Sequence, residues 1–297
     1  MSRLGRTFVL TSLCIILVAC NRPESESTDT QSADLRPDNL RVVTLSPHLA
    51  ELVFAVGAGD LLVGVTAYTD YPEAAAALPV VGDAFNLDQE QLAVLAPNVL
   101  LSWDTGTPAH VVDELRTRGY RVEVISTTTL ESLPKALIRI GELTGQVESA
   151  NAAADQFLDG LKKFATAAAD AEPIRVFYQV HSHPLYTING DHYLSQLIET
   201  CGGTNIFADL TGLAPLISVE SVVEREPEVI LASSDAGPQA FEEWRRWSDM
   251  AAIRYGNQFL MPANEIGRAT PRLLVGASAV CAALEKGREN RGEHWND

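Results

Sequence analysis

The sequence predicts an α/β protein of two similar lobes, each built on a parallel sheet, with one long rigid helix joining them. The first observation is a repeat: LDQEQLAVLAPNVLLSW at 87–103 matches ISVESVVEREPEVILAS at 217–233 in register and without gaps. Strand-like and helix-like patterns also alternate in both halves. Between the halves, residues 147–172 contain no helix breaker except Gly160, which predicts a continuous helix.

The first half opens with RVVTLSP from Arg41, an aliphatic run closed by Ser-Pro that is typical of a buried strand. A helical pattern follows and ends at Gly57, where glycine can take the left-handed cap. VLLSW and RVEVIS are the next strand candidates. We place this lobe at 40–144 and the joining helix at 145–171.

The second half repeats the order. RVFYQVHSHP from Arg175 is the strand candidate, and HYLSQLIETCG is a helix that ends at Gly202. VILAS and QFLMP supply further strands. We place this lobe at 172–289 and a C-terminal tail at 290–297.

The repeated unit carries one glutamate in each copy. Asp88 and Ser218 are good N-cap residues, so Glu90 and Glu220 fall at the second helical position. The helix dipole alone favours an acid there by about 0.3–1 kcal/mol, which is the simpler explanation. Two matched exposed carboxylates would also suit docking on a two-fold partner that presents arginines.

The N-terminus predicts export. Residues 1–19 carry two arginines and then an apolar run that is too short to cross a bilayer, which is typical of a signal peptide. The sequence Leu-Val-Ala-Cys resembles the lipobox of bacterial lipoproteins and predicts lipid on Cys20; a plain anchor or soluble export is the alternative. Residues 20–39 are almost devoid of apolar side chains and predict a flexible tether.

Composition restricts the partners and the chemistry. A net charge of −17 and a pI near 4.7 argue against nucleic acid, which needs a basic face. The chain lacks G-x-S-x-G, a P-loop and Cys-x-x-Cys. Ser46, His48 and Asp70 could be written as a triad, but nothing in the sequence fixes their geometry. We expect a monomer that is not an enzyme.

Two cysteines remain after the signal and the lipidation site. Cys201 and Cys281 would stand alone in an oxidising compartment, where such a pair is expected to form a disulfide. Two buried free thiols are the alternative.

Several segments together resemble one family. RVVTLSPHLAELVFAVG, AYTDYP, CGGTNIF at 201, RATPRLL at 268 and the two glutamate helices are similar to the helical-backbone binding proteins of metal-chelate ABC importers. The resemblance covers about residues 40–286. It implies a two-lobed binding protein outside the cell membrane. Together with the lipobox-like sequence, it leads us to expect a lipid-anchored protein in the periplasm or on the outer face of the cell membrane. It also implies that Glu90 and Glu220 dock on a dimeric permease with ATPase subunits, and that Cys201 pairs with Cys281.

The resemblance further implies the ligand. Cobalamin-binding members of the family lead us to expect cobalamin or a related corrinoid, and haem or a ferric siderophore is the alternative, with Tyr68 or Tyr71 as an iron ligand. Positions that carry tryptophan in those members align here with Ala214 and VGDAF, so the pocket differs. The expected ligand-binding residues follow the carboxyl ends of predicted strands: they are Tyr68, Tyr71, Phe85, Trp103, His183, Tyr186 and Arg268.

Metal chemistry is a weaker interpretation of the same loops. His181 and His183 are two apart and share a face of an extended chain, so both could reach a metal. No close spacing supplies further ligands, although His48, Asp70 and Glu265 are candidates. Hydrogen bonding is the simpler role for these histidines, so we expect no resident metal and no catalytic cofactor.

Overall fold

The computed structural model describes residues 39–83 and 85–295, with side chains to residue 292. The expected signal peptide at 1–19, the lipidation site Cys20 and nearly all of the expected tether at 20–39 lie outside these residues. The described residues all belong to one compact unit. Among them, no helix is both long and apolar enough to cross a membrane.

The first lobe contains a parallel four-stranded sheet in the order β2-β1-β3-β4. Its strands are β1 (Val42–Thr44), β2 (Leu62–Gly64), β3 (Val99–Trp103) and β4 (Arg121–Ile125). Its helices are α1 (Pro47–Ala55), η2 (Gly59–Leu61), α2 (Glu73–Ala76), α3 (Gln89–Leu95), α4 (Ala109–Thr117) and α5 (Ser132–Thr144). The central strands are almost entirely buried because helices cover a parallel sheet on both faces.

The second lobe contains a second parallel sheet in the order β10-β9-β5-β8. The strands are β5 (Ile174–Gln179), β8 (Gly203–Asn205), β9 (Val229–Ser233) and β10 (Gln258–Met261), with a separate hairpin of β6 (His181–Ser182) and β7 (Leu185–Tyr186). The helices are α7 (Tyr193–Thr200), α8 (Val219–Glu224), η3 (Ser234–Ala236), η4 (Pro238–Arg246), α9 (Ala251–Arg254), α10 (Ala263–Gly267) and α11 (Leu273–Trp295). The predicted two-lobed α/β architecture is confirmed.

The repeat found in the sequence is a repeat of structure. Helix α8 begins at the position that matches the start of α3, and strand β9 begins at the position that matches the start of β3. Each helix buries apolar residues in the core of its own lobe: Leu92 and Leu95 in the first, Val222 in the second. Each glutamate helix is therefore anchored in its own lobe by its apolar side.

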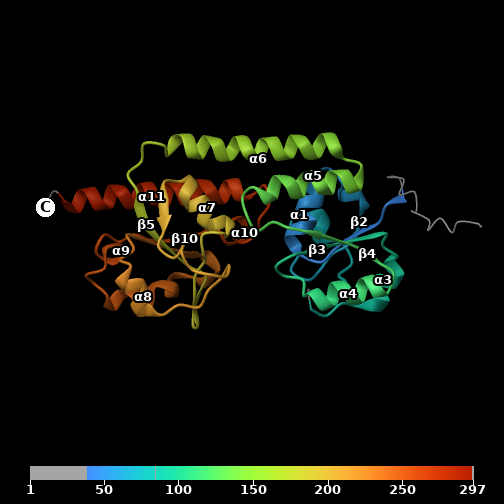
Figure 1. Cartoon of the computed structure of the whole chain (residues 1–297), viewed down its shortest axis with the longest axis horizontal. Helices are drawn as coiled ribbons and strands as arrows, with labels where there is room; N and C mark the ends of the chain where they lie inside the picture. The colour runs from blue at the N-terminus through green and yellow to red at the C-terminus, as the bar shows by residue number, and fades with distance from the viewer. Residues whose placement is uncertain (1–38, 84, 296–297) are drawn as a thin grey trace, which may run out of the picture. The chain divides into compact units, whose positions relative to one another are not determined.

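Helix α6 (Val147–Ala167) joins the lobes and runs along one side of both, while α3 and α8 lie on the side away from it (Figure 1). Its 21 residues span about 31 Å at the α-helical rise. It packs on α5 of the first lobe and on α11 of the second. Gly160 allows the second contact, because a Cβ there would lie 2.6 Å from a methyl carbon of Leu274.

The final helix extends beyond residue 289, where we expected a tail. Arg291 pairs with Glu172 and Glu228, and Asn290 donates a hydrogen bond to Asn257. These long-range partners hold a polar helical end that has no apolar periodicity of its own. The Cys201–Cys281 disulfide is present and joins α11 to the C-terminal end of α7.

Candidate functional site

The two glutamate helices start in the same way. The Asp88 carboxylate accepts a hydrogen bond from the Gln91 N–H at 2.9 Å, and the Ser218 hydroxyl accepts one from the Ser221 N–H at 3.2 Å. Glu90 and Glu220 are the second residues of their helices, and both are exposed. The predicted caps are thus formed, and each lobe presents one first-turn carboxylate to solvent.

Loops of the first lobe expose three aromatic side chains. Tyr68 is 84% exposed, Phe85 is 69% exposed and Tyr71 is 47% exposed. Tyr68 also has a φ of 67°, a left-handed conformation that L-residues adopt at a cost. A large ring that packs little and is held in an unfavourable backbone conformation is typical of a functional position.

An arginine of the second lobe anchors this aromatic loop. Arg268 donates from Nη2 to the Tyr68 carbonyl oxygen at 3.2 Å and from Nη1 to the Asp70 carboxylate. The same Nη1 lies 2.9 Å from the buried Glu51 carboxylate. The hydrogen bond from Arg268 lowers the pKa of Asp70. The guanidinium of Arg268, which we expected to contact ligand, is already engaged by three groups of the first lobe.

A cavity of about 290 Å³ lies between the lobes. The first lobe contributes Ser46, Pro47, His48, Trp103 and Thr127, and the second contributes His192, Tyr193, Gly267, Arg268 and Ala269. Trp103 and Arg268, both expected to bind ligand, therefore line the same cavity. Trp103 stands edge-on to His48, with ring centres 4.9 Å apart.

The buried His48 is a neutral hydrogen-bonding group. Burial, assisted by the charge of Arg268, lowers its pKa from 6.5 to about 3. Its Nδ1 lies 2.6 Å from the Ser46 hydroxyl oxygen, and its Nε2 lies 3.4 Å from the Thr127 hydroxyl oxygen. Asp70 is paired with Arg268, so Ser46, His48 and Asp70 do not form the serine–histidine–aspartate chain of a hydrolase.

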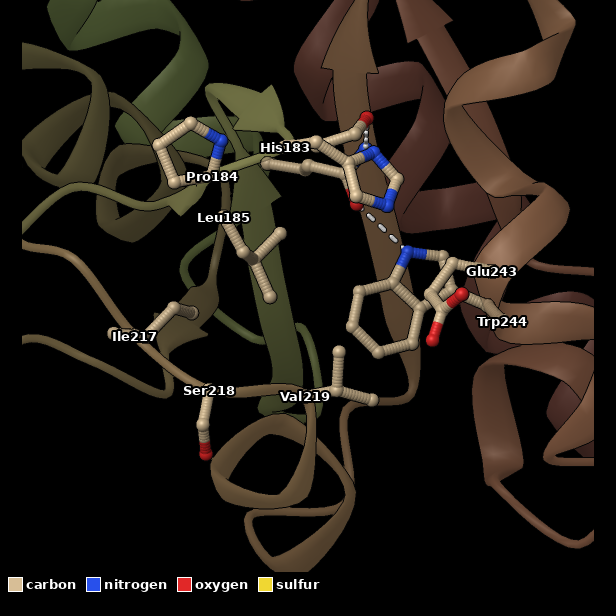
Figure 2. Close-up of a pocket in the computed structure, with 10 residues that line it drawn as sticks. His183, Pro184, Leu185, Ile217, Ser218, Val219, Glu243 and Trp244 are labelled. Atoms are coloured by element: carbon tan, nitrogen blue, oxygen red, sulfur yellow. Dashed lines mark hydrogen bonds between the residues drawn. The ribbon is translucent and has the colours of Figure 1, made fainter.

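Two pockets lie on the second lobe around the β6–β7 hairpin. The pocket in Figure 2 has a volume of about 430 Å³, with His183, Pro184 and Leu185 of the hairpin opposite Glu243 and Trp244. Ser218 and Val219, at the start of α8, also line it. The second pocket, of about 620 Å³, lies where β5 and β9 end and includes His181, Ser233 and Asp235.

His183 lines both of these pockets and is exposed. Tyr186 is half-buried in β7, opposite His181. The His181 Nδ1 interacts with the backbone of Pro184 and His183. Among residues 39–83 and 85–292, no three His, Cys, Asp or Glu side chains gather in a way that could hold a metal ion.

Glu51 is a site residue that we did not predict. It lies in α1 among Leu49, Ala50 and Leu52, and only 2% of its side chain is exposed. A carboxylate buried in an apolar helix requires a partner, so its place in HLAELVFAVG was an available signal. The partners, Arg268 and Arg272, lie near the other end of the chain.

Comparison with known proteins defines the class. Residues 42–265 match the family described as periplasmic binding protein, and the chain belongs to this family. Its members are transport receptors rather than enzymes.

Individual relatives are similar over most of the chain. The vitamin B12-binding protein of Vibrio cholerae is 32% identical over 246 residues, which is 82% of this chain and 89% of that protein. The crystal structure of the periplasmic vitamin B12 binding protein of Vibrio cholerae matches with a TM-score of 0.75 and 30% identity, over 84% of this chain and 97% of that one. A periplasmic heme binding protein from Pseudomonas aeruginosa matches with a TM-score of 0.72 and 25% identity, over 82% of this chain and 91% of that one.

Proposed function

We propose that this chain is the substrate-binding protein of an ABC importer and that it captures cobalamin or a related corrinoid. The observation that carries the proposal is its 32% identity, over 82% of its length, to a relative named for binding vitamin B12. The exposed aromatic loops of the first lobe support it. Tyr68, Tyr71 and Phe85 offer rings to a flat ligand that has apolar faces.

The remaining proposed contacts are polar or half-buried. Trp103 and Arg268 line the cavity between the lobes, and His183 lines both pockets at the β6–β7 hairpin, with Tyr186 in the same hairpin. A corrinoid carries amides around its rim, which need donors and acceptors of this kind. His183 and the backbone groups of the hairpin can supply them.

Haem or a ferric siderophore is the second candidate ligand. The similarity to the Pseudomonas aeruginosa heme binding protein favours haem, and an exposed tyrosine such as Tyr68 could ligate iron through its phenolate. Titration of the purified protein with cyanocobalamin, dicyanocobinamide, hemin and a ferric siderophore separates the candidates. We expect saturable binding of one corrinoid per chain. Saturable hemin binding with no response to either corrinoid would refute the first proposal.

We further propose that Glu90 and Glu220 dock the protein on its permease. Both are exposed first-turn carboxylates, and their helices lie on the same side of the lobes in Figure 1. Glu90→Arg with Glu220→Arg should abolish uptake of radiolabelled cyanocobalamin in cells and leave binding by the purified protein unchanged.

A matched control uses the opposite side of the molecule. Glu148→Arg with Asp159→Arg makes the same change in charge on α6, where both side chains are exposed and Glu148 is also in a first turn. This variant should retain uptake. Equal uptake by both double variants would rule out docking through Glu90 and Glu220.

We also propose that the receptor acts as a monomer outside the cell membrane and is tethered by lipid on Cys20. The family supports a periplasmic location, and the lipobox-like sequence before Cys20 supports the anchor. Cys20→Ser should abolish incorporation of radiolabelled palmitate and release the protein into the soluble fraction. Palmitate incorporation by the Cys20→Ser variant would contradict the proposal, because the lipid would then be attached to another residue.

A further inference from the structure

A cluster of charges around the buried Glu51 joins the two lobes next to the exposed tyrosines. Glu51 of the first lobe is approached by Arg268 Nη1 at 2.9 Å and by Arg272 Nη1 at 3.5 Å. Both arginines belong to the second lobe, on the segment that links α10 to α11. Glu265 also pairs with Arg272. Because a buried carboxylate requires a cationic partner, Glu51 ties the first lobe to the two arginines of the second.

The two arginines hold the aromatic loop at three points. Arg268 binds the carbonyl of Tyr68 and the carboxylate of Asp70. The third contact is with Tyr71: the guanidinium carbon of Arg272 lies over the face of its ring, 4.2 Å from the ring centre. A planar cation at this distance attracts the face of the ring and fixes its orientation. The part of Tyr71 that remains exposed is therefore presented in a defined plane.

Arg272 is itself held in place from two sides. The Glu51 side chain is 2% exposed and the Arg272 side chain is 23% exposed, so neither can move freely into solvent. Glu51 Oε2 and Arg272 Nη1 are also buried without a hydrogen-bond partner among the described residues. A movement of a few tenths of an ångström would bring these two side chains within hydrogen-bond distance.

We propose that Arg272 is a positioning residue for ligand binding: held by Glu51 and Glu265, it sets the plane of the Tyr71 ring on which a flat ligand stacks. The proposal rests on the proposed binding function for its effect on affinity. It makes a separate statement about the free protein, namely that Tyr71 is ordered by a residue of the other lobe. If the ion pair only stabilised the contact between the lobes, replacing Arg272 would not change the orientation of the Tyr71 ring.

The free protein supplies the first test. Fluorine NMR of protein labelled with 3-fluorotyrosine would report each ring, and loss of one signal in Tyr71→Phe would assign Tyr71. Arg272→Met keeps the aliphatic stem and removes the cation, so it should move the Tyr71 signal toward that of a free tyrosine. Arg139→Met is the matched control, because Arg139 also pairs with two glutamates but on the exposed surface of the first lobe. An unchanged Tyr71 signal in Arg272→Met would overturn the proposal.

Affinity supplies the second test, with cyanocobalamin and hemin as probes. Arg272→Met should weaken binding about tenfold in the wild-type background and less than twofold in the Tyr71→Ala background. Equal losses in both backgrounds would overturn a role through Tyr71. If the wild-type protein binds neither probe, the proposed function fails, and the fluorine signal alone then decides the positioning role. Should Arg272→Met not fold, Arg272→Lys keeps the charge without the planar fork, and it should move the Tyr71 signal less but in the same direction.

Discussion

Tyr68 offers a test in which stability and binding should change in opposite directions. Its φ of 67° costs an L-residue about 1–2 kcal/mol, and an 84% exposed ring recovers little of this through packing. Asparagine tolerates the left-handed conformation much better than tyrosine does. Tyr68→Asn should therefore raise the free energy of unfolding by about 1 kcal/mol, measured by urea denaturation. The Arg268 hydrogen bond is retained because it is made to the backbone carbonyl.

The same substitution should weaken ligand binding. Stacking on one face of the ring would bury about 80 Å² of apolar surface, which corresponds to about 2 kcal/mol, or about 30-fold in Kd. Titration with cyanocobalamin would measure this loss, and Tyr68→Phe, which retains the ring, is the control that should bind as the wild type does. A Tyr68→Asn protein that is less stable than the wild type, or that binds within twofold of it, would refute the reasoning.

Three further predictions concern stability. Cys201→Ala with Cys281→Ala opens a bridge between residues 80 apart and should cost about 4–5 kcal/mol in urea denaturation; a loss below about 1 kcal/mol would contradict the chain-entropy argument. Burial lowers the pKa of His48 to about 3 in the folded protein. Between about pH 6.5 and 3, the His48 imidazole is therefore protonated in the unfolded chain but not in the folded one. Stability should thus fall as pH falls through this window, by up to about 1.4 kcal/mol per pH unit, and His48→Gln should reduce the slope of unfolding free energy against pH. Asp88→Ala and Ser218→Ala should each cost about 1 kcal/mol in thermal unfolding, and the two losses should add because the caps belong to different lobes.

The sequence was sufficient for features that depend on local chemistry. Asp88 and Ser218 cap their helices because a short polar side chain can reach the free N–H groups two or three residues ahead. The internal repeat predicted both glutamate helices and the strands that follow them. The disulfide followed from having two cysteines left in an oxidising compartment.

The charge cluster between the lobes depends on long-range geometry and could not be predicted. Glu51 and Arg268 are separated by 217 residues, and no local pattern indicates that they meet. For the same reason we expected the last helix to end at residue 289, whereas it continues to Trp295. Its polar end is stabilised by Glu172 and Glu228 rather than by an apolar stripe. The sequence also could not predict which aromatic rings are exposed, because exposure depends on the residues that pack around each loop.

Helix α11 is the last element of the second lobe to be synthesised among the described residues. All strands of the first sheet lie within residues 42–125, so that sheet is complete in the chain well before α11 is made. The core of the second lobe is completed later, because α11 packs against β5 and β10 and carries Cys281. Until then its apolar surface remains open to proteases and to self-association. The maturation of this receptor is therefore most vulnerable in its second half, and a nascent chain that stalls before residue 273 leaves that half without its closing element.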